Sequence, residues 1–263
     1  MTLIKQNNYI NLLILNKMIF FNKYMEHKVK QINNNNNSPD NNGKKYLIII
    51  ACHCDSQIKV DTIKKNLRYF AFENFNKIII NSKGLQYNEI VKEICSRYKN
   101  TEYFETENNN YYDYGKWINA LENLVDYNKY DYIVFTNDSF KIHNSINHFF
   151  NLAAKHNVEL YGYNDTTQTK YHYQSYIFIL RKDAIQIFIN KVTASNLKIN
   201  NQSDVILNFE VNMVDWFSTH KSFLKIGNFG LNKGHNIFFT NDKLYLPLKK
   251  TGLLPFTKLK RVT

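Results

Sequence analysis

Six consecutive apolar residues occupy positions 46 to 51, Tyr46-Leu47-Ile48-Ile49-Ile50-Ala51. A short run of this kind, rich in β-branched side chains and without alternating polar residues, is typical of a strand buried on both faces. Three further strands are expected downstream, at residues 77–80, 101–106 and 130–135. These runs predict a sheet at the centre of the molecule.

Segments with apolar residues at helical spacing separate these strands. They cover residues 58–72, 87–98 and 116–125. Strands that alternate with helices predict an α/β fold in which a mostly parallel sheet is covered on both faces.

The second half of the chain is less regular. We expect helices at 145–156, 183–192 and 204–220, and strands at 158–163 and 173–180. The first half resembles a nucleotide-binding sheet, and the mixed second half could hold a second substrate. Ligands of open α/β sheets bind outside the carboxyl ends of the strands, so the residues just past the first and fourth strands are the first candidates for a site.

A polar run before the first strand predicts a boundary. Residues 32–43 read Ile-Asn-Asn-Asn-Asn-Asn-Ser-Pro-Asp-Asn-Asn-Gly, which cannot build a core. We therefore expect an N-terminal extension and linker over residues 1–43 and a single domain over residues 44–263. The apolar run at 9–21 is too short and interrupted to span a bilayer, and an interfacial helix stays open.

The net charge of +12 is concentrated at the two ends of the chain. Residues 1–43 carry five Lys and two acidic residues, and residues 243–263 carry five Lys, one Arg and no acidic residue. A nucleic-acid-binding domain normally concentrates its cations on a folded face, so this distribution argues against nucleic acid as a partner. The basic C-terminal stretch fits either peripheral contact with an anionic membrane surface or a solvated tail.

The chain has an odd number of cysteines, Cys52, Cys54 and Cys95. This argues against a disulfide framework and for a reducing, cytoplasmic location. Cys52-His53-Cys54 has the residue types of a zinc site, but no second ligand pair accompanies it, so structural zinc is not expected.

The main candidate site follows the fourth strand, at Thr136-Asn137-Asp138-Ser139-Phe140. A carboxylate flanked by an amide and a hydroxyl is an oxygen-rich cluster suited to Mg²⁺ or Mn²⁺ carrying a diphosphate. Asn, Asp and Ser are also ordinary turn residues, so a strand-ending turn explains the same sequence equally well.

Three more clusters place polar groups where a ligand could meet them. Asp113 can cap the third helix, and Gly115 lets a backbone come close to a ligand. Residues 170–176, Lys-Tyr-His-Tyr-Gln-Ser-Tyr, mix polar groups with aromatic rings as sugar pockets do. Glu210 interrupts an otherwise apolar helix, either as a partly buried carboxylate with a raised pKa or as one turned to solvent.

Taken in order, these clusters resemble the rhamnan synthesis protein F glycosyltransferases, nucleotide-sugar-dependent enzymes with a GT-A-like fold. The resemblance covers residues 44–263. Its five motifs are residues 109–115, Asn137-Asp138-Ser139, residues 172–176, Phe209-Glu210 and a closing Gly252-Leu253-Leu254-Pro255-Phe256-Thr257-Lys258. Tyr111 stands where the family has its first glycine, and the closing motif has one extra residue before its proline.

The resemblance implies a cytoplasmic hexosyltransferase. It would transfer a sugar, rhamnose or another hexose, from a nucleoside diphosphate-sugar to a hydroxyl of a glycan acceptor, with Mn²⁺ or Mg²⁺ bound by Asp138. The donor pocket would be formed by Asp113, Gly115, Asn137, Ser139, His172, Gln174, Ser175 and Lys258. An inverting mechanism would also need a carboxylate base, for which Glu210 is the first candidate and Asp165 the second.

A rival interpretation is a non-catalytic sugar- or nucleotide-binding module on the same fold. It is motivated by the single carboxylate at Asp138, where many GT-A enzymes have two, and by Tyr111. For the basic tail, the resemblance favours packing of residues 252–258 on the domain, with Lys258 near the donor phosphates, over a membrane anchor.

Overall fold

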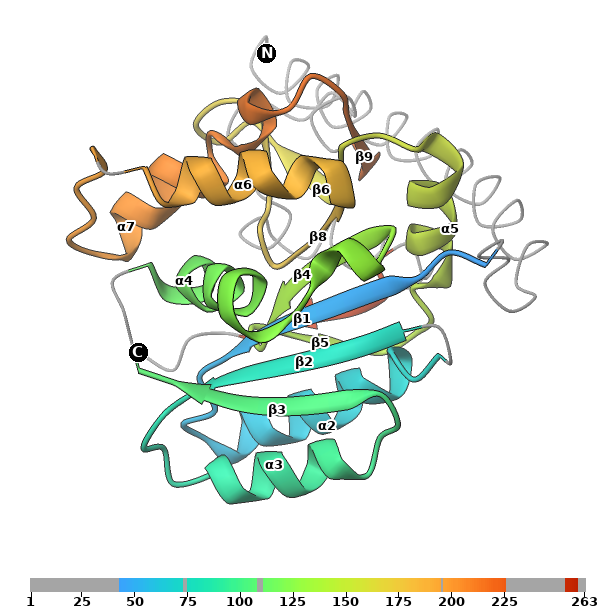
Figure 1. Ribbon diagram of the computed structural model, residues 1–263, viewed down its shortest axis with the longest axis vertical. Helices are drawn as coiled ribbons and strands as arrows, with labels where there is room; N and C mark the ends of the chain where they lie inside the picture. The colour runs from blue at the N-terminus through green and yellow to red at the C-terminus, as the bar shows by residue number, and fades with distance from the viewer. Residues whose placement is uncertain (1–42, 73–74, 108–110, 195, 226–253, 260–263) are drawn as a thin grey trace, which may run out of the picture.

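A computed structural model describes residues 43–72, 75–107, 111–194, 196–225 and 254–259 of the 263-residue chain (Figure 1). One sheet of eight strands crosses the molecule in the order β3-β2-β1-β4-β8-β6-β7, and β9 pairs with β6. The sheet is mostly parallel and helices flank both faces, so the predicted α/β fold is confirmed. The predicted N-terminal extension lies outside the described residues, except for Gly43.

The first half of the chain builds the parallel part of the sheet. Its strands are β1 (Tyr46–Cys52), β2 (Phe75–Ser82), β3 (Thr101–Thr106) and β4 (Tyr132–Asn137). Strand β1 lies between β2 and β4, so Ile49 pairs with Ile78 on one side and with Phe135 on the other. Because the four strands are parallel, their carboxyl ends lie along one edge of the sheet. We call this the carboxyl edge.

Two layers of helices cover the sheet. The first contains α2 (Gln57–Tyr69), α3 (Asn88–Ser96) and α5 (Asn147–His156). The second contains α4 (Tyr112–Asn119) and α6 (Ile185–Val192), which lie on the opposite side from α2 and α3 in Figure 1. Short helical turns are η1 (Ala120–Leu124), η2 (Tyr127–Lys129) and η3 (Lys182–Ala184).

Successive side chains of β1 point into different layers. Ile48 and Ile50 belong to the core under the first layer, whereas Leu47 and Ile49 belong to the core under the second. Burying one such side chain completely stabilises the fold by about 1.5–3 kcal/mol. The unbroken apolar run of β1 therefore holds both layers at once.

The second half adds antiparallel strands beside β4. Strand β8 (Ile177–Arg181) pairs antiparallel with both β4 and β6 (Leu160–Thr166), and β9 (His220–Leu224) pairs parallel with β6. The single strand expected at 173–180 is wrong, since β7 (His172–Tyr173) is separated from β8 by a turn. In this turn the main-chain N–H of Ser175 donates to the Glu210 carboxylate, not to a neighbouring strand.

The continuous helix expected at 204–220 is also wrong. The chain forms α7 (Gln202–Val205), the π-helical turn η4 (Ile206–Glu210), the 3-10 turn η5 (Met213–Trp216) and then β9. The amides of Asn208 and Asn212 donate back to the carbonyls of Asp204 at 2.7 Å and Leu207 at 2.9 Å. Such side-chain bonds compete with a regular helix, which gives a reason for the interruption.

A small two-stranded sheet fixes the C-terminal segment. Strand β10 (Phe256–Lys258) pairs antiparallel with β5 (Phe140–Ile142), and the main-chain N–H of Leu259 donates to the Ser139 carbonyl at 2.8 Å. The Phe256 ring is fully buried and lies 5.1 Å from that of Phe140. Residues 254–259 therefore pack on the domain, as the resemblance implied for this segment. In the part of the chain that the structure describes, no helix is long and apolar enough to cross a membrane.

Candidate active site

Polar residues gather where β1, β2 and β4 end, along the carboxyl edge. Asp138 follows β4 directly and is buried, with 7% of its surface exposed. One of its oxygens, Oδ2, accepts a hydrogen bond of 2.7 Å from the main-chain N–H of His53, just past β1. The predicted position of Asp138 at the end of the fourth strand is confirmed.

Asn137 joins Asp138 to the start of α4. Its Nδ2 donates to Oδ2 of Asp113 at 2.8 Å, and its Oδ1 accepts from the main chain and the hydroxyl of Ser139 at 3.0 and 2.6 Å. The second set of bonds is a side-chain turn, so the interpretation of this motif as a strand-ending turn is confirmed, and its interpretation as a cation site stays a prediction. Three predicted residues, Asp113, Asn137 and Asp138, are thereby brought together.

Asp113 is partly buried and lies within electrostatic range of Asp138. Burial raises the pKa of Asp113 to about 6, and the negative charge of Asp138 adds to this rise. Lys116 and the Asn137 amide act in the opposite direction. The sequence interpretation placed Asp113 in the donor pocket and counted Asp138 as the single carboxylate of the metal motif.

Cations that the sequence interpretation missed lie beside these carboxylates. Lys116 of α4 is 5% exposed, and its Nζ donates to the Cys52 carbonyl at 2.5 Å and to Oγ of Ser82 at 2.9 Å. Lys59 of α2 donates to the His53 carbonyl at 2.7 Å. Helix α4, helix α2 and the residue after β1 thus bring positive charge or N–H groups to the carboxyl edge.

His53 is a further residue that the sequence interpretation did not place in the site. Its Nδ1 lies 2.8 Å from Oγ of Ser82. Burial lowers the pKa of His53, and the charges of Lys59 and Lys116 lower it further. The available signal was its position just past the first strand, which the sequence analysis named as a first candidate for a site without assigning His53 a role there.

A second cluster surrounds Glu210, at the end of η4. Its carboxylate accepts hydrogen bonds from the main chain of Ser175 at 3.1 Å and from the Ser175 hydroxyl. Nε2 of His172 lies 3.9 Å from its other oxygen, and Nδ1 of His172 lies 2.7 Å from the Lys170 carbonyl. Glu210 is therefore neither isolated nor fully solvent-exposed, since 18% of its side chain is exposed.

Tyr114 relates the two clusters. Burial raises its pKa well above the ordinary value, and the charges of Glu210 and of Asp113 raise it further. Both carboxylates therefore lie within electrostatic range of one hydroxyl on α4. Figure 1 shows α7 and the start of α4 on the same side of the molecule as the carboxyl edge.

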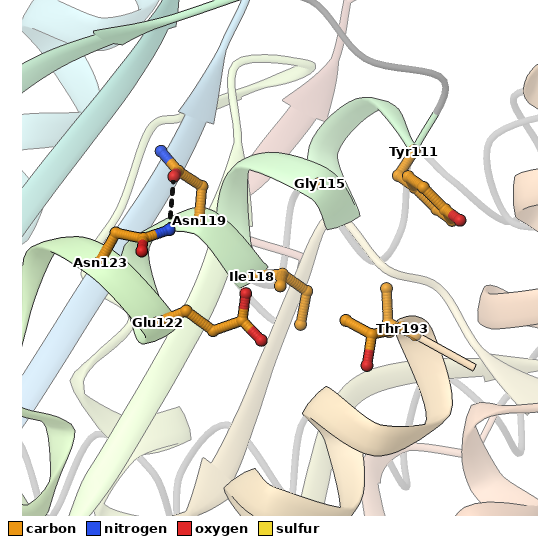
Figure 2. A pocket seen from close by; sticks show the side chains of 8 residues that line it. Tyr111, Gly115, Ile118, Asn119, Glu122, Asn123 and Thr193 are labelled. Atoms are coloured by element: carbon orange, nitrogen blue, oxygen red, sulfur yellow. Dashed lines mark hydrogen bonds between the residues drawn. The ribbon is translucent and has the colours of Figure 1, made fainter. Parts of the chain in front are cut away.

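The structure does not bring every predicted site residue into these clusters. Asp165 is 1% exposed; burial raises the pKa of Tyr171, and the charge of Asp165 raises it further. Gln174 is also buried and accepts a hydrogen bond from Asn164 at 3.3 Å. Gly115 lies on α4 but lines a groove between α4 and the end of α6 (Figure 2).

Lys258 reaches the neighbourhood of Asp138 through main-chain pairing. It is exposed and stands opposite Phe140 in the small sheet, one residue before the Leu259 bond to Ser139. The predicted role of Lys258 at donor phosphates stays a prediction.

The divalent cation expected at Asp138 stays a prediction. Within the described residues no group of three His, Cys, Asp or Glu side chains forms a metal site. A cation carried by a diphosphate needs only one or two protein carboxylates, because phosphate oxygens and water complete its shell. Asp138 and Asp113 supply two, and the pKa of Asp113 is raised first by burial and then by the negative charge of Asp138.

Comparisons with known proteins give partial likenesses. No family model matches the chain, so the resemblance to rhamnan synthesis protein F glycosyltransferases stays a prediction. The virulence protein VirA of Vibrio anguillarum is 32% identical over 114 residues, which is 41% of this chain and 36% of VirA. The chain therefore matches only about a third of the length of this relative.

Two solved structures are similar to this chain at low identity. The glycosyltransferase GlyE of Streptococcus pneumoniae TIGR4 has a TM-score of 0.49 and 10% identity, over 83% of this chain and 55% of GlyE. Residues 1–349 of S. aureus TarS have a TM-score of 0.47 and 11% identity, over 68% of this chain and 57% of that one. Both scores are below 0.5, so these likenesses do not establish the family.

Proposed function

We propose that this chain is a glycosyltransferase of GT-A-like fold, which transfers a sugar from a nucleoside diphosphate-sugar to a hydroxyl of a glycan acceptor. The observation that carries the proposal is the carboxyl edge, where Asn137 bonds Asp113 and the His53 main chain bonds Asp138. Carboxylates next to the buried Lys116 and the half-buried Lys59 suit a ligand that brings both a divalent cation and phosphates.

The donor would bind along this edge. Asp138, with Asp113 beside it, would hold Mn²⁺ or Mg²⁺, which when bound supplies charge that stabilises the leaving diphosphate. A lysine ammonium has three protons, and Lys116 uses two of them on Cys52 and Ser82. The third is left for a phosphate oxygen, and Lys258 would add a second cation.

Glu210 would act as the base that an inverting reaction needs, taking the proton of the acceptor hydroxyl. The Ser175 main chain and hydroxyl fix the orientation of its carboxylate, and its side chain keeps partial exposure. Asp165 is less suited to this role because it is almost completely buried.

The donor sugar is proposed to be a hexose, rhamnose or another, on the resemblance alone. The proposed cytoplasmic location rests on the cysteine content, and peripheral membrane contact would rest on the basic residues near the C-terminus. None of these three proposals changes the chemistry assigned to the carboxyl edge.

The test is release of nucleoside diphosphate from a panel of nucleotide sugars with Mn²⁺, with and without oligosaccharide acceptors. We expect slow release by hydrolysis with one donor and faster release with a suitable acceptor. Saturable binding of a nucleotide sugar without any release would instead identify the rival, a non-catalytic binding module. Absence of both binding and release would contradict the proposal.

A further inference from the structure

We propose that the groove on the outer face of α4 binds a neutral saccharide, apart from the carboxyl edge. The groove has a volume of about 300 Å³ and lies between α4 with η1 and the end of α6 (Figure 2). This volume lies within the range of small-ligand sites. Ile118 and Glu122 line it at helical spacing, whereas Asp113 and Lys116 lie on the other face of the helix.

One part of the groove is aromatic and apolar. The Tyr111 ring stacks on Phe209, with centroids 5.8 Å apart and planes 21° apart, so its orientation is fixed before any ligand binds. Ile118 and Val192 continue the apolar surface. A pyranose ring presents a face of C–H groups that packs on such a surface, because aromatic faces carry partial negative charge.

The other part carries hydrogen-bonding groups for hydroxyls. Nδ2 of Asn123 donates to Oδ1 of Asn119 at 3.0 Å, as Figure 2 shows. Among the described residues, this leaves the Asn119 amide nitrogen as a donor and the Asn123 amide oxygen as an acceptor without a partner. Glu122 adds a carboxylate acceptor at the same wall.

The charge of the groove selects a neutral ligand. No Lys, Arg or His is among its described lining residues, and Glu122 would repel an anion. This is the opposite of the carboxyl edge, which holds Lys116 and Lys59. A nucleotide or a phosphate therefore fits the carboxyl edge, and an uncharged polyhydroxyl ligand fits the groove.

The inference rests on the proposed function in one respect, that the saccharide held here would be part of the glycan acceptor. Tyr111 is two residues from Asp113, so a glycan held in the groove would lie close to the start of the donor site. The groove would then hold the acceptor chain while its reactive end reaches the carboxyl edge.

The experiment titrates the full chain with maltotriose, cellotriose and N-acetylchitotriose at millimolar concentration, followed by calorimetry and saturation-transfer NMR. We expect one of them to bind, and Asn119→Ala or Glu122→Ala to weaken binding about tenfold. The matched control is Asn190→Ala. Asn190 accepts a hydrogen bond from Gln186 on α6, just as Asn119 accepts one from Asn123. Asn190 is not among the residues that line the groove. Binding should be unchanged in this control.

Two outcomes would overturn the groove assignment: no binding of any of the three saccharides, or equal affinity in wild type and Asn119→Ala. Hydrolysis of nucleotide sugar is measured on the same samples and should be the same in wild type and in the control Asn190→Ala. Saccharide binding without hydrolysis in the wild type would contradict the proposed function while leaving the groove assignment in place.

Discussion

The main-chain N–H of His53 donates to the Asp138 carboxylate at 2.7 Å, although the two residues are 85 positions apart in sequence. The bond exists because β1 and β4 are neighbours in the sheet, so the first residue beyond each strand meets the other. The donor is a main-chain N–H, which every substitution of His53 except proline keeps. A substitution of Asp138 can therefore remove the negative charge of the side chain while keeping the hydrogen bond that orients it.

Asp138→Asn should retain the fold and lose the proposed reaction. The amide oxygen of Asn can still accept from His53, so we expect the free energy of unfolding to change by no more than about 1 kcal/mol. Loss of the negative charge should reduce nucleoside diphosphate release about 10²- to 10³-fold. Denaturant unfolding and the release assay measure the two effects. Full release by this variant, or wild-type release that survives excess chelator, would contradict the metal role.

His148 should make the protein sensitive to acid. Burial lowers its pKa to about 4, and its ring packs on Phe223 with centroids 4.8 Å apart. A folded pKa below the unfolded value of about 6.5 gives stability that is present above pH 6.5 and is lost as the pH falls through 4. The loss is on the order of 3 kcal/mol. His148→Phe keeps a ring there and cannot titrate, so its unfolding free energy should fall less between pH 7 and pH 4. Equal losses in both proteins would contradict this assignment.

Tyr112 is held in a left-handed backbone conformation, with φ of +52°, directly before Asp113. Such a conformation costs a bulky residue roughly 1–2 kcal/mol and costs glycine almost nothing. Tyr112→Gly should therefore leave the free energy of unfolding unchanged or raise it by about 1 kcal/mol. Lys92→Gly, at an exposed position inside α3, is the control and should lower it by about 1 kcal/mol. If Tyr112→Gly lowers the free energy of unfolding as much as Lys92→Gly does, the backbone strain at Tyr112 is absent.

The parallel half of the fold could be predicted because strands buried on both faces leave continuous apolar runs in the sequence. The position of Asp138 followed from the same runs, since it comes directly after one of them. The prediction of a continuous helix at 204–220 was wrong. The spacing of apolar residues gives no information about the hydrogen bonds that the side chains of Asn208 and Asn212 make to the main chain.

Lys116 could not be identified from one sequence. It lies in a helix between buried aromatic residues, and its partners Cys52 and Ser82 are 64 and 34 residues away. Only the pairing of β1 with β2 brings these two partners together. The signal that was available is its spacing three residues after Asp113, which places both on one helix face.

Gly162 of β6 makes room for the Tyr173 ring. A Cβ atom at this position would lie 2.4 Å from Cγ of Tyr173, which is too close for any real contact. Gly162→Ala should therefore lower the free energy of unfolding by about 1–3 kcal/mol, as overpacked cores do. In a Tyr173→Ala background the same substitution should cost much less, and unfolding of all four proteins gives the coupling. A coupling energy near zero would show that the Tyr173 ring is not the reason why position 162 requires glycine.

The last prediction concerns Lys258, for which the small sheet gives a structural basis. Strand β10 is held by β5, and the Leu259 bond to Ser139 keeps the segment beside the residue that follows Asp138. If Lys258 neutralises donor phosphates, Lys258→Ala should weaken donor binding or release about tenfold, because a charge-assisted contact contributes about 1.5–3 kcal/mol. The control is Lys141→Ala, which removes the same charge from the paired strand, opposite Thr257. Sedimentation with anionic liposomes should be alike in both variants. A fall in liposome binding in Lys258→Ala with donor release unchanged would instead assign this lysine to a membrane surface.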